Sequence, residues 1–230
     1  MRCLKFIDDE TAVSGSRDGT LRVWNIDAAV CKSTLEGHTD FVRCLDVGAN
    51  MIVSGGKDTV GRVWNTAGEC LRTLSGHSGY IHALVMNENG QVATGSIDHT
   101  VRIWDAESGS CVAVLEGHTS LVGLIQFHGK ILITAGADGH VRLWSLETLE
   151  LLHSLAAHQG AVTSFDAVGD HLVTGGTDGS VKLWNLQTGQ VIRQVGESGK
   201  AVWRVAFGAG GRTITAVARE ETMLEVYESS

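Results

Sequence analysis

The chain has 230 residues, 43% of them hydrophobic, and a formal net charge of −8. This composition is typical of a globular protein, and the acidic charge argues against nucleic-acid binding driven by overall charge. No apolar run is long enough to span a membrane, and no apolar segment follows Met1 as in a secretory signal. We therefore expect a protein of the nucleus, the cytoplasm or both, whose five cysteines are reduced and mostly packed.

Short segments with alternating apolar residues, bounded by glycine, aspartate or asparagine, follow one another along the chain and predict strands. In the second unit these strands are expected near residues 42–47, 51–55, 60–65 and 69–74. Tryptophans spaced 40 residues apart mark the repeat: Trp24, Trp64, Trp104, Trp144 and Trp184. Four strands in each repeat are typical of a propeller blade. We predict one domain over residues 1–230, with units near 1–35, 36–74, 75–115, 116–155, 156–195 and 196–230.

The sixth unit is degenerate, because Tyr227 stands in the place of the tryptophan and Glu221 in that of an aspartate. No segment for an outer strand follows it. The predicted fold class is therefore an all-β propeller with six visible repeat units. It is either a six-bladed ring with an incomplete last blade or a piece of a larger propeller.

The Gly-His pairs and the Trp-Asp or Trp-Asn pairs of the repeat resemble the WD40 family. In that family a histidine, a hydroxyl residue, an aspartate and a tryptophan form a buried hydrogen-bond network in each blade. A buried indole N–H needs an acceptor, and a hydroxyl can accept from it and bond onward to the histidine. The resemblance implies four such sets: His38, Ser54, Asp58 and Trp64; His77, Thr94, Asp98 and Trp104; His118, Thr134, Asp138 and Trp144; and His158, Thr174, Asp178 and Trp184.

Recurring Ser/Thr, His and Asp are also the residue types of a hydrolase triad. Several copies at one spacing cannot all be active sites, however, and the tryptophan explains the set. The sequence contains no Gly-x-Ser-x-Gly, CxxC, HExxH or nucleotide-binding motif. We expect no catalysis, no metal and no cofactor. The basic residues that precede each tryptophan are expected to face solvent: Arg22, Arg62, Arg102, Arg142 and Lys182.

The positions at which the units differ are more informative about function, because the shared pattern only builds the scaffold. At the start of the first strand the first three units carry Arg2, Arg43 and His82, and before the shared aspartate the first two carry Arg17 and Lys57. Both places lie at one rim of a propeller. A cluster of basic side chains there favours a phosphorylated peptide. The alternative is that these residues form ion pairs with Asp18, Asp40 or Asp46.

A closer resemblance is to the F-box/WD40 substrate receptors of SCF-type ubiquitin ligases, of the cell-division-cycle-four kind. It is carried by residues 2–4, 13–24, 41–45, 115–123 and 201–207. It implies part of an eight-bladed propeller that binds a phosphodegron through Arg2, Arg17 and Arg43, with Trp203 and Arg204 on the same groove. His82 and Lys57 depart from positions that are aromatic there.

The partners expected from this resemblance are proteins, specifically phosphorylated substrates, and neither nucleic acid nor membrane. The sequence contains no F-box, so docking to the SCF core is expected only if an F-box is supplied elsewhere. A different function also fits the repeats: a generic WD40 scaffold that joins proteins and recognises no phosphate.

Overall fold

A computed structural model describes residues 2–48, 50–197, 200–208, 213–218 and 224–228, and Glu221 lies outside them. Within these ranges the ordered elements are all strands, and none of the described segments is a helix that could span a membrane. The chain divides into two compact units, Met1–Phe127 and His128–Ser230. The all-β prediction is confirmed.

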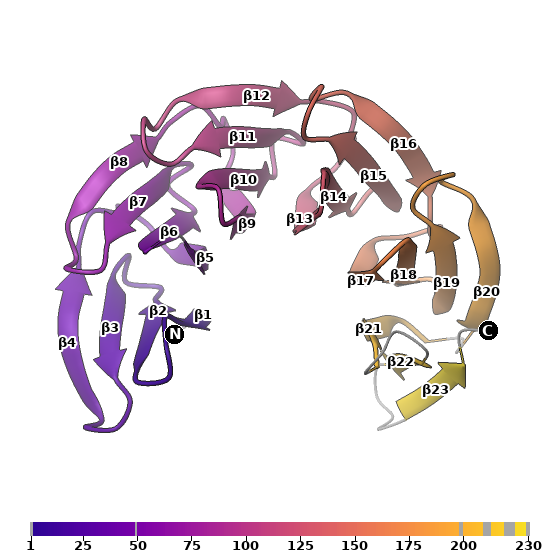
Figure 1. Cartoon of the computed structure of the whole chain (residues 1–230), viewed down its shortest axis with the longest axis horizontal. Coiled ribbons are helices and arrows are strands. Elements are labelled where there is room, and N and C mark those ends of the chain that lie inside the picture. Colours follow the sequence, from indigo (N-terminus) through magenta and orange to yellow (C-terminus); the bar gives the residue numbers. More distant parts are fainter. Residues whose placement is uncertain (1, 49, 198–199, 209–212, 219–223, 229–230) are drawn as a thin grey trace. The chain divides into compact units, whose positions relative to one another are not determined.

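Three four-stranded sheets account for most of the first unit, and in each the strands follow chain order. In Figure 1, β4, β8 and β12 lie at the outer side of their sheets. The bounds are β1 Cys3–Phe6, β2 Thr11–Gly15, β3 Leu21–Asn25, β4 Val30–Leu35, β5 Val42–Gly48, β6 Met51–Gly56, β7 Gly61–Asn65, β8 Cys70–Leu74, β9 Ile81–Met86, β10 Gln91–Ser96, β11 Val101–Asp105 and β12 Cys111–Leu115. The four strands predicted for the second repeat are correct to within one residue at each end.

The remaining strands form sheets in the orders β13-β14-β15-β16, β17-β18-β19-β20 and β21-β22-β23. The sixth sheet thus has three strands among the described residues, as predicted. Tyr227 lies in its last strand, paired in register with Ile214. The bounds are β13 Val122–His128, β14 Ile131–Gly136, β15 His140–Ser145, β16 Leu151–Ala156, β17 Val162–Val168, β18 His171–Gly176, β19 Ser180–Asn185, β20 Val191–Glu197, β21 Val202–Phe207, β22 Thr213–Ala218 and β23 Leu224–Glu228.

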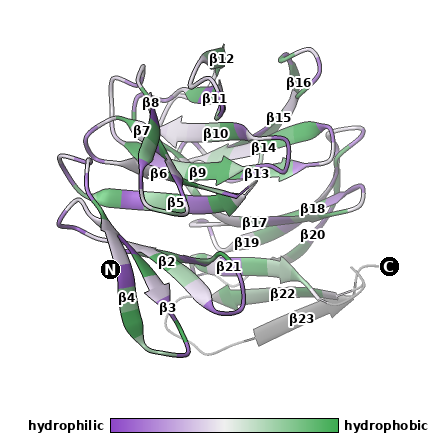
Figure 2. Cartoon of the chain, turned by 60° about the vertical axis from the view of Figure 1, so that its left-hand side comes forward, coloured by the Kyte–Doolittle hydropathy of each residue, from purple (hydrophilic) through white to green (hydrophobic). Residues whose placement is uncertain are grey.

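Burial follows the position of a strand in its sheet. The second strand is almost continuously buried, as in β6 and β10, whereas the fourth strand is mostly exposed, as in β8. First strands contain both buried and exposed residues, and Figure 2 shows apolar and polar residues following one another along β5. The second strand therefore has neighbours on both faces, which explains why its sequence is nearly all apolar or small.

Neighbouring sheets of the first unit pack through apolar side chains. Trp64, 1% exposed, and Val42 of the second sheet belong to one cluster with Val13 and Leu35 of the first sheet. Neighbouring sheets can approach each other closely because the second strand of each sheet ends in small residues. A Cβ added at Gly55 would lie 2.7 Å from Ile81 Cγ2 of the next sheet. This glycine therefore sets the spacing between two blades.

Two expectations about side chains are wrong. All five cysteines are free thiols, but those of the outer strands are exposed and not packed: Cys31, Cys70 and Cys111. Each pairs in register with the tryptophan of its sheet, on a strand that no further strand covers. Arg142 is buried and not solvated, because its Nη1 donates to Asp138 at 3.1 Å.

Candidate binding site

The hydrogen-bond network of the second blade joins three elements. Trp64 on β7 donates its Nε1–H to Ser54 Oγ on β6 at 2.8 Å. His38, in the loop before β5, lies 2.7 Å from Ser54 Oγ through Nε2 and 2.8 Å from Asp58 Oδ2 through Nδ1. The three side chains of His38, Ser54 and Trp64 are buried. A hydroxyl held between an indole and an imidazole in this way is unavailable to a substrate.

The third blade shows the protonation state of each side chain in the network. Burial lowers the pKa of His77, so the ring is neutral at pH 7, with Nδ1–H donating to Asp98 and Nε2 accepting from Thr94. Trp104 donates to the same Thr94 hydroxyl at 2.8 Å. Burial opposes ionisation of Asp98, but hydrogen bonds from Thr100 and His77 lower its pKa to about 2. The network is thus a neutral histidine held by a carboxylate.

Similar contacts recur in the other blades. In the fifth, His158 contacts Asp178 and Thr174 at 2.9 Å each, and Trp184 donates to Thr174 at 3.0 Å.

The fourth and first blades show parts of the same network. In the fourth, Trp144 donates to Thr134 at 2.9 Å, His118 is buried, and Asp138 accepts from Arg142. In the first, Trp24 donates to Ser14 at 2.8 Å. Repetition in every one of these blades points to a structural role.

A cavity of about 290 Å³ opens on the first unit where the blades differ in sequence. It is lined by Arg2, Phe41, Val42, Arg43, Tyr80 and His82. Arg2 and Arg43 are exposed and His82 is half-buried. Arg43 Nη2 donates to His82 Nε2 at 2.7 Å, which joins two neighbouring sheets. The structure therefore brings together three of the basic residues that the repeat comparison singled out.

β-Bulges set the direction of these side chains. The register of β5 with β6 shifts between Val42 and Cys44, so that Arg43 is the extra residue. His82 is the extra residue of β9 in the same way. A bulge turns a side chain away from the regular pleat and is common next to functional sites. Thr163 and Trp203 occupy the same position in β17 and β21, so this device recurs along the chain.

Arg17 and Lys57 gather at the ring of Phe41, beside this cavity. Arg17 Cζ lies 5.8 Å and Lys57 Nζ 5.3 Å from the ring centroid, both within range of a cation–π interaction. Lys57 also lies 3.9 Å from Asp40. The aromatic ring thus links the basic residues of the loops to those that line the cavity.

The ion-pair alternative accounts for few of these basic residues. Asp18 pairs with Arg22 at 3.9 Å and Asp46 with Lys5 at 3.0 Å. Asp40 pairs with Lys57. Within the described parts of the chain, no carboxylate lies within 4.0 Å of the guanidinium groups of Arg2, Arg17 or Arg43. No ion pair with a described carboxylate therefore neutralises these three cations, and each can attract an anion.

Trp203 and Arg204 lie in the second unit, both exposed on β21. Trp203 is 60% exposed and lines a pocket of about 330 Å³ together with Thr163, Thr177, Ala201 and Val202. A large exposed indole beside two threonines is typical of a surface that binds a peptide. The predicted residues therefore form one group around the arginines and one around Trp203.

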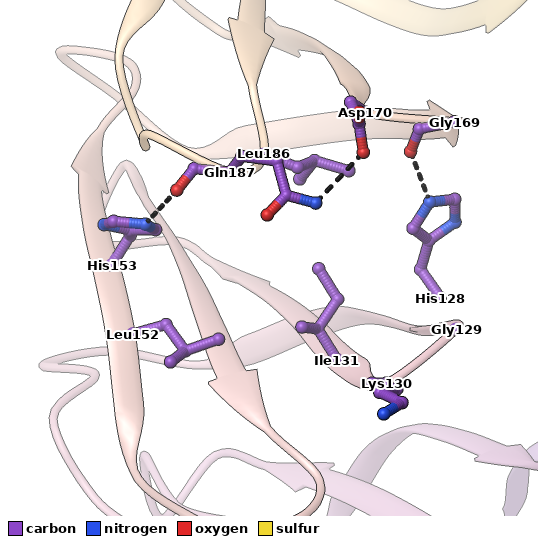
Figure 3. Close-up of a pocket in the computed structure, with 10 residues that line it drawn as sticks. All are labelled: His128, Gly129, Lys130, Ile131, Leu152, His153, Gly169, Asp170, Leu186 and Gln187. Atoms are coloured by element: carbon purple, nitrogen blue, oxygen red, sulfur yellow. Dashed lines mark hydrogen bonds between the residues drawn. The ribbon is translucent and has the colours of Figure 1, made fainter.

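The second unit also contains a pocket of about 550 Å³ that was not predicted (Figure 3). His128 donates from Nε2 to Gly169 O at 2.7 Å on one side, and His153 from Nε2 to Gln187 O at 3.1 Å on the other. Between them lie apolar side chains, including Ile131 and Leu186. No signal in one sequence marks this pocket, because its residues lie on strand ends, the outer strand and connecting loops, outside the shared motif. Within the described ranges, no cluster of three or more potential ligands fits a metal ion.

Comparison with known proteins agrees with this architecture. The model of the family described as "WD domain, G-beta repeat" matches residues 1–25, 29–65, 68–105, 109–145 and 149–185. Nuclear distribution protein PAC1-2 of Uncinocarpus reesii is 33% identical over 150 residues, covering 53% of this chain and 32% of that protein. Cell division control protein 4 of Candida albicans is 31% identical over 143 residues, covering 54% of this chain and 21% of that protein.

The crystal structure of the computationally designed Ika8 protein is also similar, with a TM-score of 0.91 and 31% sequence identity. The similarity covers 99% of this chain and 70% of the designed one. The match spans about a third or less of the length of these two natural relatives. The predicted fold class is confirmed: the chain belongs to the WD40 family and is a β-propeller domain for protein–protein interaction.

Proposed function

We propose that this WD40 domain binds peptides that carry phosphorylated serine or threonine, with a phosphate in the cavity between Arg2 and Arg43. One observation carries the proposal: two exposed guanidinium groups line a single cavity, and neither is paired with a carboxylate of the described residues. Arginine matches the geometry of phosphate because its planar fork can donate two parallel hydrogen bonds.

The surroundings of the cavity favour a peptide over a free ion. Phe41 and Tyr80 supply aromatic walls for the residues next to the phosphorylated side chain. Arg17 and Lys57, gathered at the Phe41 ring, extend the basic surface beyond the cavity and can receive a second phosphate. A doubly phosphorylated peptide is therefore the preferred ligand.

The similarity to a cell division control protein 4 supports a narrower proposal. The domain is part of, or derived from, a substrate receptor of an SCF-type ubiquitin ligase and acts on phosphorylated substrates in the nucleus or cytoplasm. Docking to the SCF core requires an F-box supplied elsewhere.

Two synthetic peptides test the proposal: one with two phosphothreonines, each followed by proline, and its unphosphorylated twin. Hydrogen bonds to charged groups contribute about 1.5–3 kcal/mol each, so two of them give the phosphopeptide an affinity at least about 100-fold higher. Isothermal titration calorimetry measures both dissociation constants. Equal binding of the twins indicates a scaffold that does not recognise phosphate, and absence of binding contradicts the proposal as well.

A further inference from the structure

The contact between Arg43 and His82 defines the protonation state of the imidazole. Arg43 Nη2 can only donate, so His82 Nε2, 2.7 Å away, must accept with its lone pair. The ring in this structure is therefore neutral and carries its proton on Nδ1. If His82 took up a second proton, Nε2 would become a donor that faces another donor, and the contact would break.

The surroundings of His82 keep it neutral in the free protein. Its Nδ1 is buried without a hydrogen-bond partner among the described residues. Burial first, and the charge of Arg43 second, hold the pKa of His82 below its usual value of 6.5, against a smaller opposing effect of the Gly123 backbone. Among the described groups, Arg43 from β5 contacts the ring, the backbone of Gly123 from β13 lies beside it, and Arg2 and Tyr80 line the same cavity. None of them is an anion.

A phosphate that binds in the cavity changes both the hydrogen-bond partner of Arg43 and the charge beside His82. Its oxygens are better acceptors for Arg43 than a neutral imidazole, because they carry charge. Once Arg43 turns to the phosphate, Nε2 of His82 is left beside a dianion, which favours the charged form of the ring. The bulge that holds His82 in β9 already directs it into the same cavity as Arg43.

We propose that His82 is a specificity-determining residue of the phosphopeptide site: a phosphate dianion displaces it from Arg43, and it then takes up a proton and donates through Nε2 to the phosphate. The proton comes from solvent, and no covalent bond forms or breaks. The cavity thus gains a third cation when its ligand is a dianion, and a monoanionic carboxylate in the same place gives a smaller gain. This inference rests on the function proposed above.

The corresponding bulge residues of later blades cannot act in this way. Thr163 and Trp203 carry no group that titrates near neutral pH, and Gly123 at the aligned position has no side chain. The effect is therefore specific to the cavity in which His82 meets Arg43.

The test measures protons exchanged on binding at pH 7.0, by calorimetry in two buffers with different ionisation enthalpies. The probe is a peptide with one phosphothreonine followed by proline. A phosphate with a second pKa of about 6 releases about 0.1 proton when its dianion is bound at pH 7. Wild-type protein should instead show net uptake of several tenths of a proton. His82→Gln, whose amide can still accept from Arg43 and does not titrate, should show only the release, with roughly 3- to 10-fold weaker binding.

His82→Phe serves as a second variant should the glutamine variant fold poorly, as judged by circular dichroism. Phosphopeptide binding without proton uptake, or equal uptake by wild type and variant, would overturn the role of His82 and leave phosphate recognition intact. Equal binding of the phosphorylated and unphosphorylated peptides would overturn the proposed function, and this inference with it. Inorganic phosphate as a further probe should bind more weakly than the peptide. Equal affinity would refute the peptide as the ligand.

Discussion

The substitution Ser54→Ala tests the physical account of the scaffold. It removes the one hydroxyl that joins Trp64 and His38 in the second blade. The alanine side chain fits in the space of the serine, so sterically the change is small. Its effect on stability comes from the polar atoms that lose their partner.

The size of this effect follows from burial. Ser54 is 0%, Trp64 1% and His38 8% exposed, so water cannot replace the lost hydroxyl. Each buried donor or acceptor left without a partner costs about 1–3 kcal/mol. Two such atoms, the Trp64 Nε1–H and His38 Nε2, give an expected loss of about 3 kcal/mol in the free energy of unfolding. With an m-value of about 3 kcal/mol/M, the urea midpoint falls by about 1 M.

The assay is urea unfolding followed by tryptophan fluorescence and circular dichroism. Ser54→Thr is the matched control, because threonine occupies the equivalent position in three other blades and accepts from tryptophan there at 2.8–3.0 Å. It should cost less than about 1 kcal/mol. A loss below about 0.5 kcal/mol for the alanine variant, or equal losses for both variants, would refute the argument.

Three further predictions concern packing, pH and thiols. Gly55→Ala places a Cβ 2.7 Å from Ile81 Cγ2 and should lower the free energy of unfolding by about 1–3 kcal/mol in the same urea assay. Because folding lowers the pKa of His77 below 6.5, the unfolded chain binds its proton first, so stability measured by thermal melting should fall below about pH 6.5. It should fall again between about pH 4 and 2 as Asp98, with its pKa of about 2, is protonated. In native protein a thiol reagent should react quickly with the exposed cysteines Cys31, Cys70 and Cys111. It should react slowly with Cys44, because burial raises the pKa of that thiol.

Each of these has a control. Gly123→Ala should be tolerated, since its added Cβ would meet nothing closer than 3.7 Å, and an equal loss in both variants would contradict the packing argument. Stability that stays constant from pH 7 to pH 3 would contradict the account of the buried histidines. Fast labelling of Cys44 in native protein, at the rate seen in urea, would show that the blade interior is open.

Much of the scaffold is predictable from the sequence because the same short-range interactions recur in each blade. The spacing of Trp64 and Asp58 places the tryptophan on β7 and the aspartate in the turn before it, and alternation along β5 defines its two faces. The errors concern side chains whose surroundings lie outside the repeat. Cys70 was expected to be packed because it begins a stretch in which apolar residues alternate, yet its strand is the outermost of the sheet.

The candidate site was predictable as a set of residues but not as a geometry. Aligning the units singled out Arg43 and His82, because both break the pattern at the same position. Their hydrogen bond joins residues 39 positions apart, on strands of different sheets, so it depends on how the sheets pack. The bulges that aim both side chains into one cavity are backbone features with no mark in the sequence. The ring of Phe41 between Arg17 and Lys57 was missed for the same reason.

The central claim is that the cavity around Arg43 binds phosphate. Its most direct test compares Arg43→Glu with Arg72→Glu, since Arg72 is also an exposed arginine on a strand and is not among the residues that line this cavity. Both variants change the net charge equally and should keep the circular dichroism of the wild type. The account predicts that Arg43→Glu weakens binding of the doubly phosphorylated peptide at least about 100-fold while Arg72→Glu changes it less than about 3-fold. Phosphopeptide binding that survives Arg43→Glu, or falls equally in both variants, would contradict it.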